Sequence, residues 1–488
     1  MNNSPIVVVI LGTTGVGKTK LSIELSQKFN GEVINADALQ VYKGLDIITN
    51  KATEEERQSV PHHLFNFLEP TKEYSVTEFV EDAIQKINDI HSRNKIPIII
   101  GGTHYYIQSL LFNNLLMSSN TTPDIQKTQE IEKEEHLEEN LKLIENLFSR
   151  KEEISKEEIY ELLEKIDPDT AKTRHPNDER RNRRSLEIYL NNKIPQSKII
   201  ENQKLYKQSF RYRTCCFWLY SEQTVLNQRL DDRVDAMIEK GLFDEIKEMK
   251  TYYDILNKKN GDKENLYTRG IFQAIGFKEF DAYLKQLNNK EMEAEALEDL
   301  KKSSLEKMKN ATKRYSRKQI SWIKNKLLPR FIEDTLDPQQ GRLYILDITD
   351  VSQWDNAVSK VSNNVLKDFI QGNETLNPRE VNTVAREIYH EIEMPVDPHS
   401  DDVAQLRKRQ HSSQWEKYEC DVCRNSDKKP RLLNGLVEWE RHKKSRSHRM
   451  NVKRQRKIKE KADKEVIVVE KEEEEEEEKK GRKIKEEK

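Results

Sequence analysis

A glycine-rich segment near the start of the chain has the residue types needed to hold a phosphorylated ligand. Its glycines let successive backbone N–H groups point at phosphate oxygens, Lys18 adds a cation, and Thr19 can hold Mg²⁺ at the positive end of the following helix. A kinase, an NTPase and a transferase that uses a diphosphate ester all need this arrangement, so the pattern leaves all three open. The segment consists of Gly12, Thr13, Thr14, Gly15, Val16, Gly17, Lys18 and Thr19.

Two further segments place polar side chains directly after apolar strand patterns. Asp37 follows residues 32–35 and fits equally a helix cap, a carboxylate that holds Mg²⁺ through water, or a base for an amine-bearing substrate. Gly101-Gly102-Thr103 follows residues 96–100 and offers backbone room and one hydroxyl. An ordinary NTPase more often carries an acidic residue after such a strand, which argues weakly against ATP hydrolysis.

Alternating strand and helix patterns position these groups. Strands are expected over residues 5–11, 32–35, 96–100, 214–220 and 343–348, with helices such as 19–29 and 76–93 between them. This alternation predicts a mostly parallel sheet that binds ligands at the carboxyl ends of its strands, and the polar segments follow that rule. The expected fold class is α/β, with a P-loop NTPase-like parallel-sheet core, a helical insertion domain and a C-terminal zinc finger of the C2H2 type.

Composition sets limits on the class of protein. The 488 residues carry 84 Lys+Arg against 86 Asp+Glu, a formal net charge of −2, and hydrophobic and charged residues each make up 35%. This apolar fraction is low for a single compact domain. It indicates that the chain combines a well-packed domain with additional polar segments. No apolar run approaches the roughly 20 residues that span a bilayer, so we expect no membrane partner. Four cysteines are too few for a disulfide scaffold and indicate a reducing compartment.

The charge is unevenly distributed along the chain. Residues 118–165 form a charge-rich amphipathic pattern with leucines near helical spacing, which predicts a helical insertion. Residues 403–464 hold 20 Lys+Arg against 8 Asp+Glu, a local balance of +12. Such a basic segment favours a nucleic-acid partner in spite of the neutral total. An unbroken run of Glu over 472–478 indicates a disordered tail.

Cys420 and Cys423, followed by His442 and His448, have the spacing of a zinc site. Two thiolates on a turn and two imidazoles one and a half turns apart on a helix can meet one Zn²⁺ tetrahedrally. Eighteen residues separate the thiols from the first imidazole, more than in standard C2H2 fingers, so base-reading registers do not transfer. We therefore expect a structural Zn²⁺ in this basic module.

Taken together, these residues resemble the eukaryotic tRNA dimethylallyltransferases, also called tRNA isopentenyltransferases, of the IPP transferase family. The resemblance covers roughly residues 5–370, and its many motifs stand in one order along the chain. Beside the phosphate loop they are residues 37–42, 48–51, 61–63, 101–106, 167–168, 175–178, Arg181 and Arg184, 233–235, 237–238, 270–273, 275–279, and Tyr315, Arg317, Gln319 and Trp322.

The resemblance implies transfer of the dimethylallyl group of dimethylallyl diphosphate to N6 of the adenosine just 3′ of the anticodon of a tRNA. Negative charge builds on the diphosphate as its bond to C1 breaks, and backbone N–H groups, Lys18, Arg233 and Mg²⁺ would stabilise it. Asp37 would accept the N6 proton, and Thr103 would donate a hydrogen bond near the bridging oxygen. The adenine must leave its stack to react, which a single-stranded anticodon loop makes less costly.

The resemblance also implies where the tRNA binds. By itself the arginine run over residues 178–184 fits a solvated helix face, and the matched context assigns it to RNA. Three positions depart from the family pattern, because Ala38 stands where Ser is usual, Asn182 where an apolar residue is usual, and Lys313 where Arg is usual. The implied tRNA-binding residues are Asp37, Ala38, Leu39, Gln40, Thr103, Arg180, Arg181, Arg184, Gln273 and Lys278.

Three rival functions are an adenylate dimethylallyltransferase, as in cytokinin synthesis, a P-loop small-molecule kinase, and a zinc-finger RNA-binding protein with an inactive catalytic domain. The insertion, the arginine run and the basic module argue against a small acceptor, and the intact site residues argue against lost catalysis. We expect a monomer in the cytoplasm, with nuclear or mitochondrial pools left open. The expected domains are the first part of the core (1–117), a tRNA-binding helical insertion (118–205), the second part of the core with basic helices (206–370), a linker (371–410), the finger (411–460) and a charged tail (461–488).

Overall fold

The computed structural model describes residues 5–113, 137–150, 154–205, 209–259, 266–287, 292–332, 340–394, 417–424 and 430–456. The chain divides into two compact units. Residues 1–118 and 206–394 form the first unit, and residues 119–205 and 395–488 form the second. The helical insertion therefore interrupts the first unit. Within the described ranges, no helix combines the length and the apolarity that crossing a membrane requires.

The first unit is built on a six-stranded parallel sheet, which confirms the expected parallel α/β core. The strand order β3-β2-β4-β1-β5-β6 places β1 between β4 and β5 in the middle. All five expected strands are present, and the short β3 was not expected because its two histidines carry no strand pattern. The strands are β1 (Ile6–Gly12), β2 (Gly31–Asn35), β3 (His62–His63), β4 (Ile96–Ile100), β5 (Arg213–Tyr220) and β6 (Gly341–Asp347).

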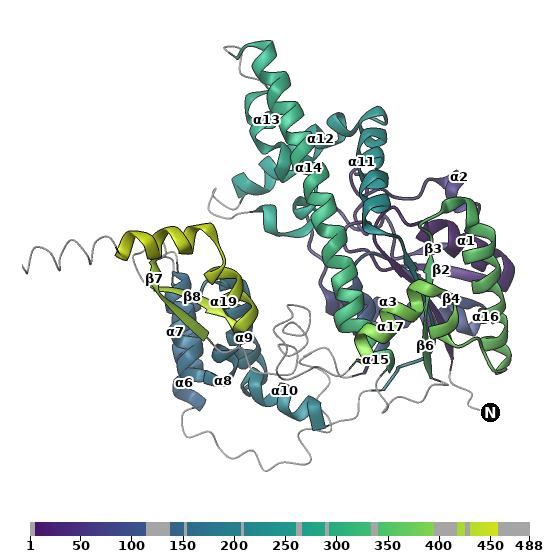
Figure 1. Ribbon diagram of the computed structural model, residues 1–488, viewed down its shortest axis with the longest axis horizontal. Helices are drawn as coiled ribbons and strands as arrows, with labels where there is room; N and C mark the ends of the chain where they lie inside the picture. The colour runs from purple at the N-terminus through teal and green to yellow at the C-terminus, as the bar shows by residue number, and fades with distance from the viewer. Residues whose placement is uncertain are drawn as a thin grey trace, which may run out of the picture. The chain divides into compact units, whose positions relative to one another are not determined.

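Alternate residues of the central strand feed two hydrophobic cores, one on each face of the sheet. Val7 and Val9 of β1 belong to one core, and Val8 and Ile10 belong to the other, because successive strand side chains point to opposite faces. The first face is covered by α3 (Val76–Ser92), α4 (His104–Leu111) and α17 (Thr383–Glu393), and the second by α1 (Lys18–Phe29), α11 (Gln223–Glu239) and α16 (Lys360–Gln371) (Figure 1).

The linker expected over residues 371–410 is wrong in its first part. Ala385, Ile388 and Tyr389 of α17 are buried in the first core, and the Tyr389 hydroxyl donates to the Leu343 carbonyl at 2.6 Å. These apolar residues recur at helical spacing between charged ones, a pattern that indicates a helix and not a linker. Residues 395–410 of the expected linker lie outside the described residues.

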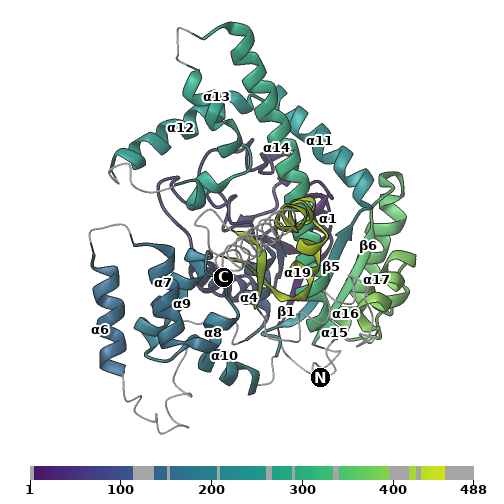
Figure 2. The same ribbon diagram turned by 60° about the vertical axis from the view of Figure 1, so that its left-hand side comes forward.

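A third core joins the loop that follows β2 to a group of helices visible in Figure 2. Val41, Leu45 and Ile48 of the loop pack with residues of these helices. Glu245 accepts hydrogen bonds from the backbone N–H groups of Ile47 and Ile48 at 2.8 and 2.5 Å, which fastens the loop. The group comprises α12 (Leu242–Lys259), η1 (Leu266–Thr268), η2 (Gly270–Gln273), η3 (Lys278–Phe280), α13 (Asp281–Gln286) and α14 (Ala294–Trp322).

The short elements of the first unit connect these layers. They are α2 (Glu54–Arg57), η4 (Ile323–Leu327), α15 (Leu328–Ile332), η5 (Val351–Gln353), η6 (Asp355–Ser359) and η7 (Pro378–Glu380).

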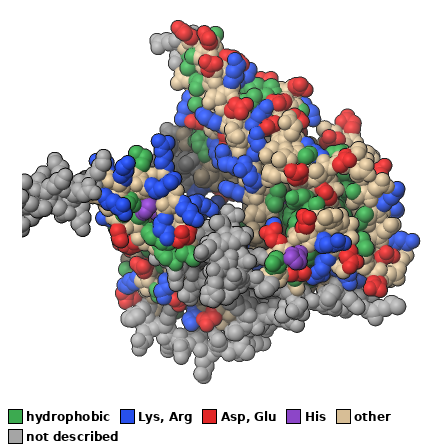
Figure 3. All heavy atoms as spheres, in the orientation of Figure 1, with side chains coloured by type: hydrophobic (Ala, Val, Ile, Leu, Met, Phe, Trp, Pro, Cys, Tyr) green, Lys and Arg blue, Asp and Glu red, His purple; other side chains and the backbone are tan. Residues whose placement is uncertain are grey.

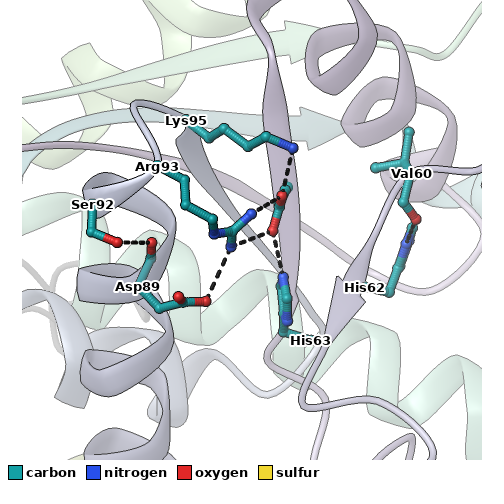
Figure 4. Close-up of polar contacts among 8 residues, drawn as sticks. Val60, His62, His63, Asp89, Ser92, Arg93 and Lys95 are labelled. Atoms are coloured by element: carbon teal, nitrogen blue, oxygen red, sulfur yellow. Dashed lines mark hydrogen bonds and ion pairs between the residues drawn. The ribbon is translucent and has the colours of Figure 1, made fainter.

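A buried carboxylate ties β2 to its neighbours. Glu32, whose side chain is 2% exposed, accepts hydrogen bonds from Arg93 at 2.9 Å and from Lys95 at 2.7 Å, and His63 Nε2 lies 2.7 Å from it. Figure 4 shows three basic side chains converging on this carboxylate: Arg93, which follows α3, Lys95, which precedes β4, and His63 of β3. The hydrogen bond from Arg93, more than any other contact, holds the pKa of Glu32 well below its usual range. The carboxylate is therefore charged in the folded protein.

In the second unit, the described part of the insertion is a cluster of five helices. Ile144, Ile159, Leu163 and Leu186 form its core. The part of the helical pattern expected over 118–136 lies outside the described residues. The helices are α6 (Leu137–Phe148), α7 (Lys156–Ile166), α8 (Pro168–Lys172), α9 (Glu179–Asn192) and α10 (Gln196–Leu205).

The C-terminal module is a small hairpin followed by helices. β7 (Lys417–Arg424) and β8 (Pro430–Asn434) pair antiparallel, and α19 (Gly435–Lys443) follows them. Residues 446–456 are helical again after a break at 444–445. The two histidines expected on one helix therefore lie on two helical segments. Lys and Arg side chains gather over this module (Figure 3).

Candidate active site and Cys/His cluster

The loop between β1 and α1 takes its shape from glycines. Gly15 and Gly17 adopt left-handed backbone angles, with φ of 80° and 83°. A Cβ at Gly17 would lie 2.8 Å from the Trp354 ring, and one at Gly12 would lie 2.8 Å from the Leu219 carbonyl. No side chain caps the first turn of α1, which begins at Lys18. The loop thus leaves helix N–H donors available at the carboxyl end of β1.

Two cations and one carboxylate share the neighbourhood of this loop. The Lys18 ammonium donates to the Thr13 carbonyl at 2.6 Å, and burial lowers the pKa of Lys18 to about 8, with Asp37 opposing and Arg233 adding to the shift. Burial likewise lowers the pKa of Arg233, on α11, to about 10, with Asp37 opposing the shift. Neither cation forms an ion pair with any residue that the structure describes. The site therefore carries two cations that Asp37 influences without forming an ion pair with either of them in the described part of the chain.

Touching strand ends bring the carboxylate and the expected hydroxyl together. A Cβ at Gly101 would lie 2.2 Å from the Ala36 carbonyl, so the backbones that leave β4 and β2 are in contact. Asp37 Oδ1 accepts the Leu39 N–H at 3.0 Å, and Thr103 Oγ1 accepts the Ala38 N–H at 2.9 Å. Because the Thr103 oxygen is the acceptor, its own proton remains available for a ligand. The contact at position 38 is made by the backbone N–H of Ala38, so it does not depend on the serine hydroxyl that is usual there.

Two residues of α14 complete the rim, in roles that the sequence analysis did not assign. Gln319 is 4% exposed and donates to the Gly102 carbonyl at 2.9 Å, and the Tyr315 hydroxyl lies 3.5 Å from the same oxygen. A Cβ at Gly102 would lie 3.2 Å from the Asp37 carboxylate. The signal in the sequence was a polar residue, Gln319, in helical register with buried Ser316 and Ile323.

His104, which follows Thr103, is buried beside the backbone of Gly12 in the glycine loop. It is 3% exposed, and its Nε2 has no hydrogen-bond partner among the described residues. Burial is the main cause that lowers the pKa of His104 to about 3, with Lys18 adding to it and a hydrogen bond to the Gly12 backbone opposing it. The imidazole is therefore neutral at working pH and adds no charge to the site.

The other expected tRNA-contacting residues of the first unit lie around the loop after β2. The Gln40 amide donates to the carbonyls of Thr49 and Asn50, both at 3.1 Å, which leaves its carbonyl oxygen for other partners. Leu39 packs at the edge of the third core. Gln273, in η2, and Lys278, in η3, are both exposed.

Lys51 is a further buried cation, and the sequence analysis gave it no role. Its side chain is 3% exposed, and its ammonium donates to the Tyr42 carbonyl at 2.5 Å, to Asp46 at 2.8 Å and to Asn66 at 2.9 Å. These hydrogen bonds join the two ends of the segment from Tyr42 to Asn66 through Lys51. Lys51 therefore shapes the loop that carries Gln40.

The arginines of the second unit lie on α9. Arg180, Arg181 and Arg184 are exposed. Arg181 pairs with Asp178, the residue before α9, at 3.5 Å, and Arg184 pairs with Glu187 of the same helix at 3.2 Å. The structure places these residues in a different unit from Lys18, Asp37, Thr103 and Arg233. Asn182, one of the departures from the family pattern, is fully buried and donates to the carbonyls of His175 and Pro176 at 3.1 and 3.3 Å.

Cys420, Cys423, His442 and His448 come together in the C-terminal module. Their ligand atoms all lie within 4.8 Å of one another. His448 Nδ1 lies 3.4 and 3.6 Å from the two sulfurs and 3.1 Å from His442 Nε2. Two thiols and two imidazoles are a donor set that structural zinc sites use. The four gathered side chains could therefore hold such an ion.

A parallel α/β sheet with a glycine loop, two unpaired cations and a carboxylate at its strand ends is the architecture of enzymes that act on phosphorylated compounds. The IPP transferase family matches residues 40–326, and the chain belongs to this family. The chain is 37% identical to the tRNA dimethylallyltransferase of Saccharomyces cerevisiae over 93% of this chain and 94% of that protein. Its identity to the Mus musculus protein of the same name is 35%, over 92% and 86%.

The fold of the chain is also similar to that of a solved structure. The crystal structure of a eukaryotic dimethylallyltransferase acting on tRNA matches with a TM-score of 0.72 at 35% identity, and the match covers 94% of this chain and 99% of that one. The family resemblance inferred from the motifs is thereby confirmed.

Proposed function

We propose that the chain transfers the dimethylallyl group of dimethylallyl diphosphate to N6 of the adenosine just 3′ of the anticodon of a tRNA. The observation that carries this proposal is the meeting of the Asp37 carboxylate and the Thr103 hydroxyl near Lys18 and Arg233, two cations that form no ion pair with any described residue. Relatives over nearly the whole chain are named for this activity.

The diphosphate is the leaving group, and the glycine loop is its P-loop cradle. Residues 12–19 supply N–H donors, and Lys18 and Arg233 supply positive charge where negative charge develops as the C1–O bond breaks. The Thr103 hydroxyl, which accepts from the Ala38 N–H, donates a hydrogen bond to the oxygen that leaves and keeps its proton. The electron pair of the broken bond stays on the diphosphate.

Asp37 acts on the acceptor adenosine, as the base that takes the N6 proton. The N6 lone pair forms the new bond to C1, and the carboxylate takes the proton that N6 then loses. The Leu39 N–H holds Asp37 Oδ1, so the carboxylate is oriented before the base arrives. An adenine amine is a weak nucleophile because its lone pair is delocalised, and a fixed carboxylate both orients N6 and removes its proton.

A magnesium ion fits the donor side of the site. Among the described residues, the cradle offers the Thr19 hydroxyl and no cluster of three or more acidic or histidine ligands. Mg²⁺ typically takes few protein ligands, with substrate phosphates and waters completing its shell, so Thr19 would hold it. When bound, the ion neutralises charge on the departing diphosphate.

The C-terminal module is a zinc finger that binds the tRNA. Cys420, Cys423, His442 and His448 would hold Zn²⁺, for which they supply a fitting donor set. The helical residues after them, together with Arg180, Arg181 and Arg184 of the insertion, present cations for RNA phosphates.

The proposal is tested with radiolabelled dimethylallyl diphosphate and either tRNA or AMP as acceptor. We expect label on tRNA only, and none on a tRNA that carries guanosine at the acceptor position. Asp37→Asn should lower kcat by about 10²–10⁴-fold, because the proton acceptor is lost while the shape is kept. The tRNA Kd should stay within about twofold of wild type.

Two other results would each contradict the proposal. Labelled AMP would point to a prenyltransferase of free nucleotides, and consumption of ATP without prenyl transfer would point to a kinase or NTPase. Asp421→Asn, a matched change of an exposed aspartate outside the site, should leave kcat unchanged.

A further inference from the structure

A tryptophan that the proposed mechanism does not use packs against the glycine loop. Trp354, between η5 and η6, is 6% exposed, and its ring fills the space that a side chain at Gly17 would need. The nearest ring carbons lie 2.8 and 2.9 Å from the position of a Cβ at Gly17. Gly17 directly precedes Lys18 and the first turn of α1. The indole therefore supports the turn that presents N–H groups and Lys18 to a ligand.

The indole is held in this position by α1 itself. Its Nε1–H donates to Glu24 at 2.9 Å, and the Ser359 hydroxyl of η6 donates to the other oxygen of the same carboxylate. The Lys20 ammonium lies 4.5 Å from the centre of the Trp354 ring, which is a cation–π contact. These contacts join the β6–α16 segment (residues 348–359) to the first two turns of α1.

The β6–α16 segment is also fastened to α11, the helix that carries Arg233. Arg229 donates hydrogen bonds to the carbonyls of Ile348 and Thr349, at 3.0 and 2.8 Å. Arg229 lies four residues, about one helical turn, before Arg233. One segment is thus bonded both to the helix of Lys18 and to the helix of Arg233, the two cations of the site.

Apolar packing joins the same three parts of the molecule. Val16 of the glycine loop, Leu230 of α11, and Ile348 and Trp354 of the β6–α16 segment are all buried in the second core. A Cβ at Gly15 would lie 3.5 Å from the Leu230 side chain, so the loop and α11 are in close proximity. Interiors packed this densely resist small displacements. The position of the glycine loop relative to α11 is therefore set by the folded protein.

We propose that Trp354 is a positioning residue for the diphosphate group of the donor. It acts through Gly17, whose left-handed conformation it supports, and through the β6–α16 segment, which fixes Lys18 relative to Arg233. The inference rests on the proposed function, because it concerns the same donor site. Two cations that act on one diphosphate need a fixed separation, since charge that is already in place stabilises the leaving group without reorganisation.

Binding of inorganic pyrophosphate tests the inference, because this probe needs neither a prenyl group nor a tRNA. Trp354→Leu should raise the pyrophosphate Kd about tenfold or more, since the loop loses the ring that supports Gly17. Trp354→Phe should have an intermediate effect, because the smaller ring fills part of the space. The Kd of tRNA should not change in either variant. Titration calorimetry measures both ligands.

A pair of Glu24 variants tests the same contact without altering the ring. Glu24→Ala removes the acceptor of the indole N–H and of the Ser359 hydroxyl, and it should raise the pyrophosphate Kd about three- to tenfold. Glu24→Gln should keep the wild-type Kd, because its amide can accept from the indole and donate to the Ser359 oxygen. Recovery by the amide distinguishes positioning from a general loss of stability. This pair also decides the inference if Trp354→Leu does not fold.

Phe369→Leu is the matched control in the same core. Phe369, on α16, is 4% exposed, and its carbonyl accepts a hydrogen bond from Arg213 at 3.0 Å. Arg213 begins β5, so Phe369 lies near the amino ends of the strands, whereas the glycine loop lies at the carboxyl end of β1. Phe369→Leu should lower the Tm of the first unit and leave the pyrophosphate Kd unchanged.

The outcomes separate this inference from the proposed function. Wild-type pyrophosphate affinity in Trp354→Leu, or equal Kd values in Glu24→Ala and Glu24→Gln, would overturn the inference even if prenyl transfer to tRNA is observed. Weaker binding in Trp354→Leu and Glu24→Ala, with recovery in Glu24→Gln, would support it even if the transferred group proved to be different. An equal loss of affinity in Phe369→Leu would show that any packing defect in this core weakens the site, and would also overturn the inference.

Discussion

The strand-end site and the Cys/His module differ in what holds their functional groups in place. Backbone N–H groups fix Asp37 and Thr103 on a sheet whose two faces are both covered by hydrophobic cores. Among the described residues of the module, the buried hydrophobic core is Cys420, Cys423 and Leu433, and the two cysteines are proposed metal ligands. The groups of the first region are held in place without a ligand, whereas in the second region the proposed metal would itself be part of the fold.

Removal of the metal should therefore separate the two regions most strongly. Chelation should unfold residues 417–456, because zinc binding contributes about 10 kcal/mol or more to folding in modules of this size. The first unit should keep its thermal transition and its Kd for dimethylallyl diphosphate. Calorimetry with and without chelator, together with donor titration, measures both. The tRNA affinity should fall, because the cations of the module lose their scaffold.

Single substitutions distinguish loss of the metal from a general effect of chelator. Cys423→Ser should reproduce the unfolding of the module, since one thiolate ligand is lost. Asp421→Ser changes an exposed neighbour between the two thiols and should leave zinc content and tRNA binding unchanged. A Cys423→Ser protein with full zinc content and wild-type tRNA affinity would refute the assigned ligand.

The two regions were also predictable from sequence to different degrees. The parallel sheet and the Cys/His cluster followed from local patterns, because strand alternation and ligand spacing are encoded within a few residues. The contact of Gln319 with Gly102 joins residues more than two hundred positions apart, and no local pattern encodes it. Lys51 was missed for a similar reason, since its burial comes from a loop that closes around it.

The predicted boundaries of helices and domains were wrong where the local composition resembled a different kind of segment. Thr383–Glu393 is rich in charge, and its apolar residues were not recognised as a helix face that completes the first core. The break of the helix at residues 444–445 also had no clear signal, although it lets the ring nitrogens of His442 and His448 come within 3.1 Å of each other from two segments. Tertiary packing decided both features.

In the first unit, the ion-pair cluster around Glu32 has the stabilising role that the proposed metal would have in the module. Glu32→Gln should destabilise the first unit by about 3 kcal/mol, because Arg93 and Lys95 would lose the buried anion that they share. Chemical denaturation at pH 7 measures the change. Glu69→Gln is the matched control, since its pair with Lys43 at 2.6 Å is about half exposed and should contribute less than about 1 kcal/mol.

The pH dependence of this difference has a definite sign. The folded protein holds the pKa of Glu32 below its usual range, so the carboxylate stabilises the fold at pH values above its unfolded pKa of about 4.3. That contribution is lost as the pH falls below this value toward the folded pKa. The gap in stability between wild type and Glu32→Gln should therefore shrink in acid. A gap that is constant from pH 7 to pH 3 would show that packing, not charge, causes the effect.

The smallest expected effect concerns the proton on Lys18, and it tests whether the strand-end site holds its charge before the donor binds. Burial lowers the pKa of Lys18 to about 8 in the free protein, so its ammonium is lost as the pH rises through that value. The Kd of dimethylallyl diphosphate should then rise by up to about tenfold for each further pH unit. Ionisation of the diphosphate itself would strengthen binding with rising pH, which is the opposite sign. Lys18→Arg should move this limb to higher pH, because a guanidinium keeps its proton. A limb near pH 8 that persists in Lys18→Arg would assign the titration to another group, and the pre-formed charge of the site would then rest on Arg233, whose pKa is about 10.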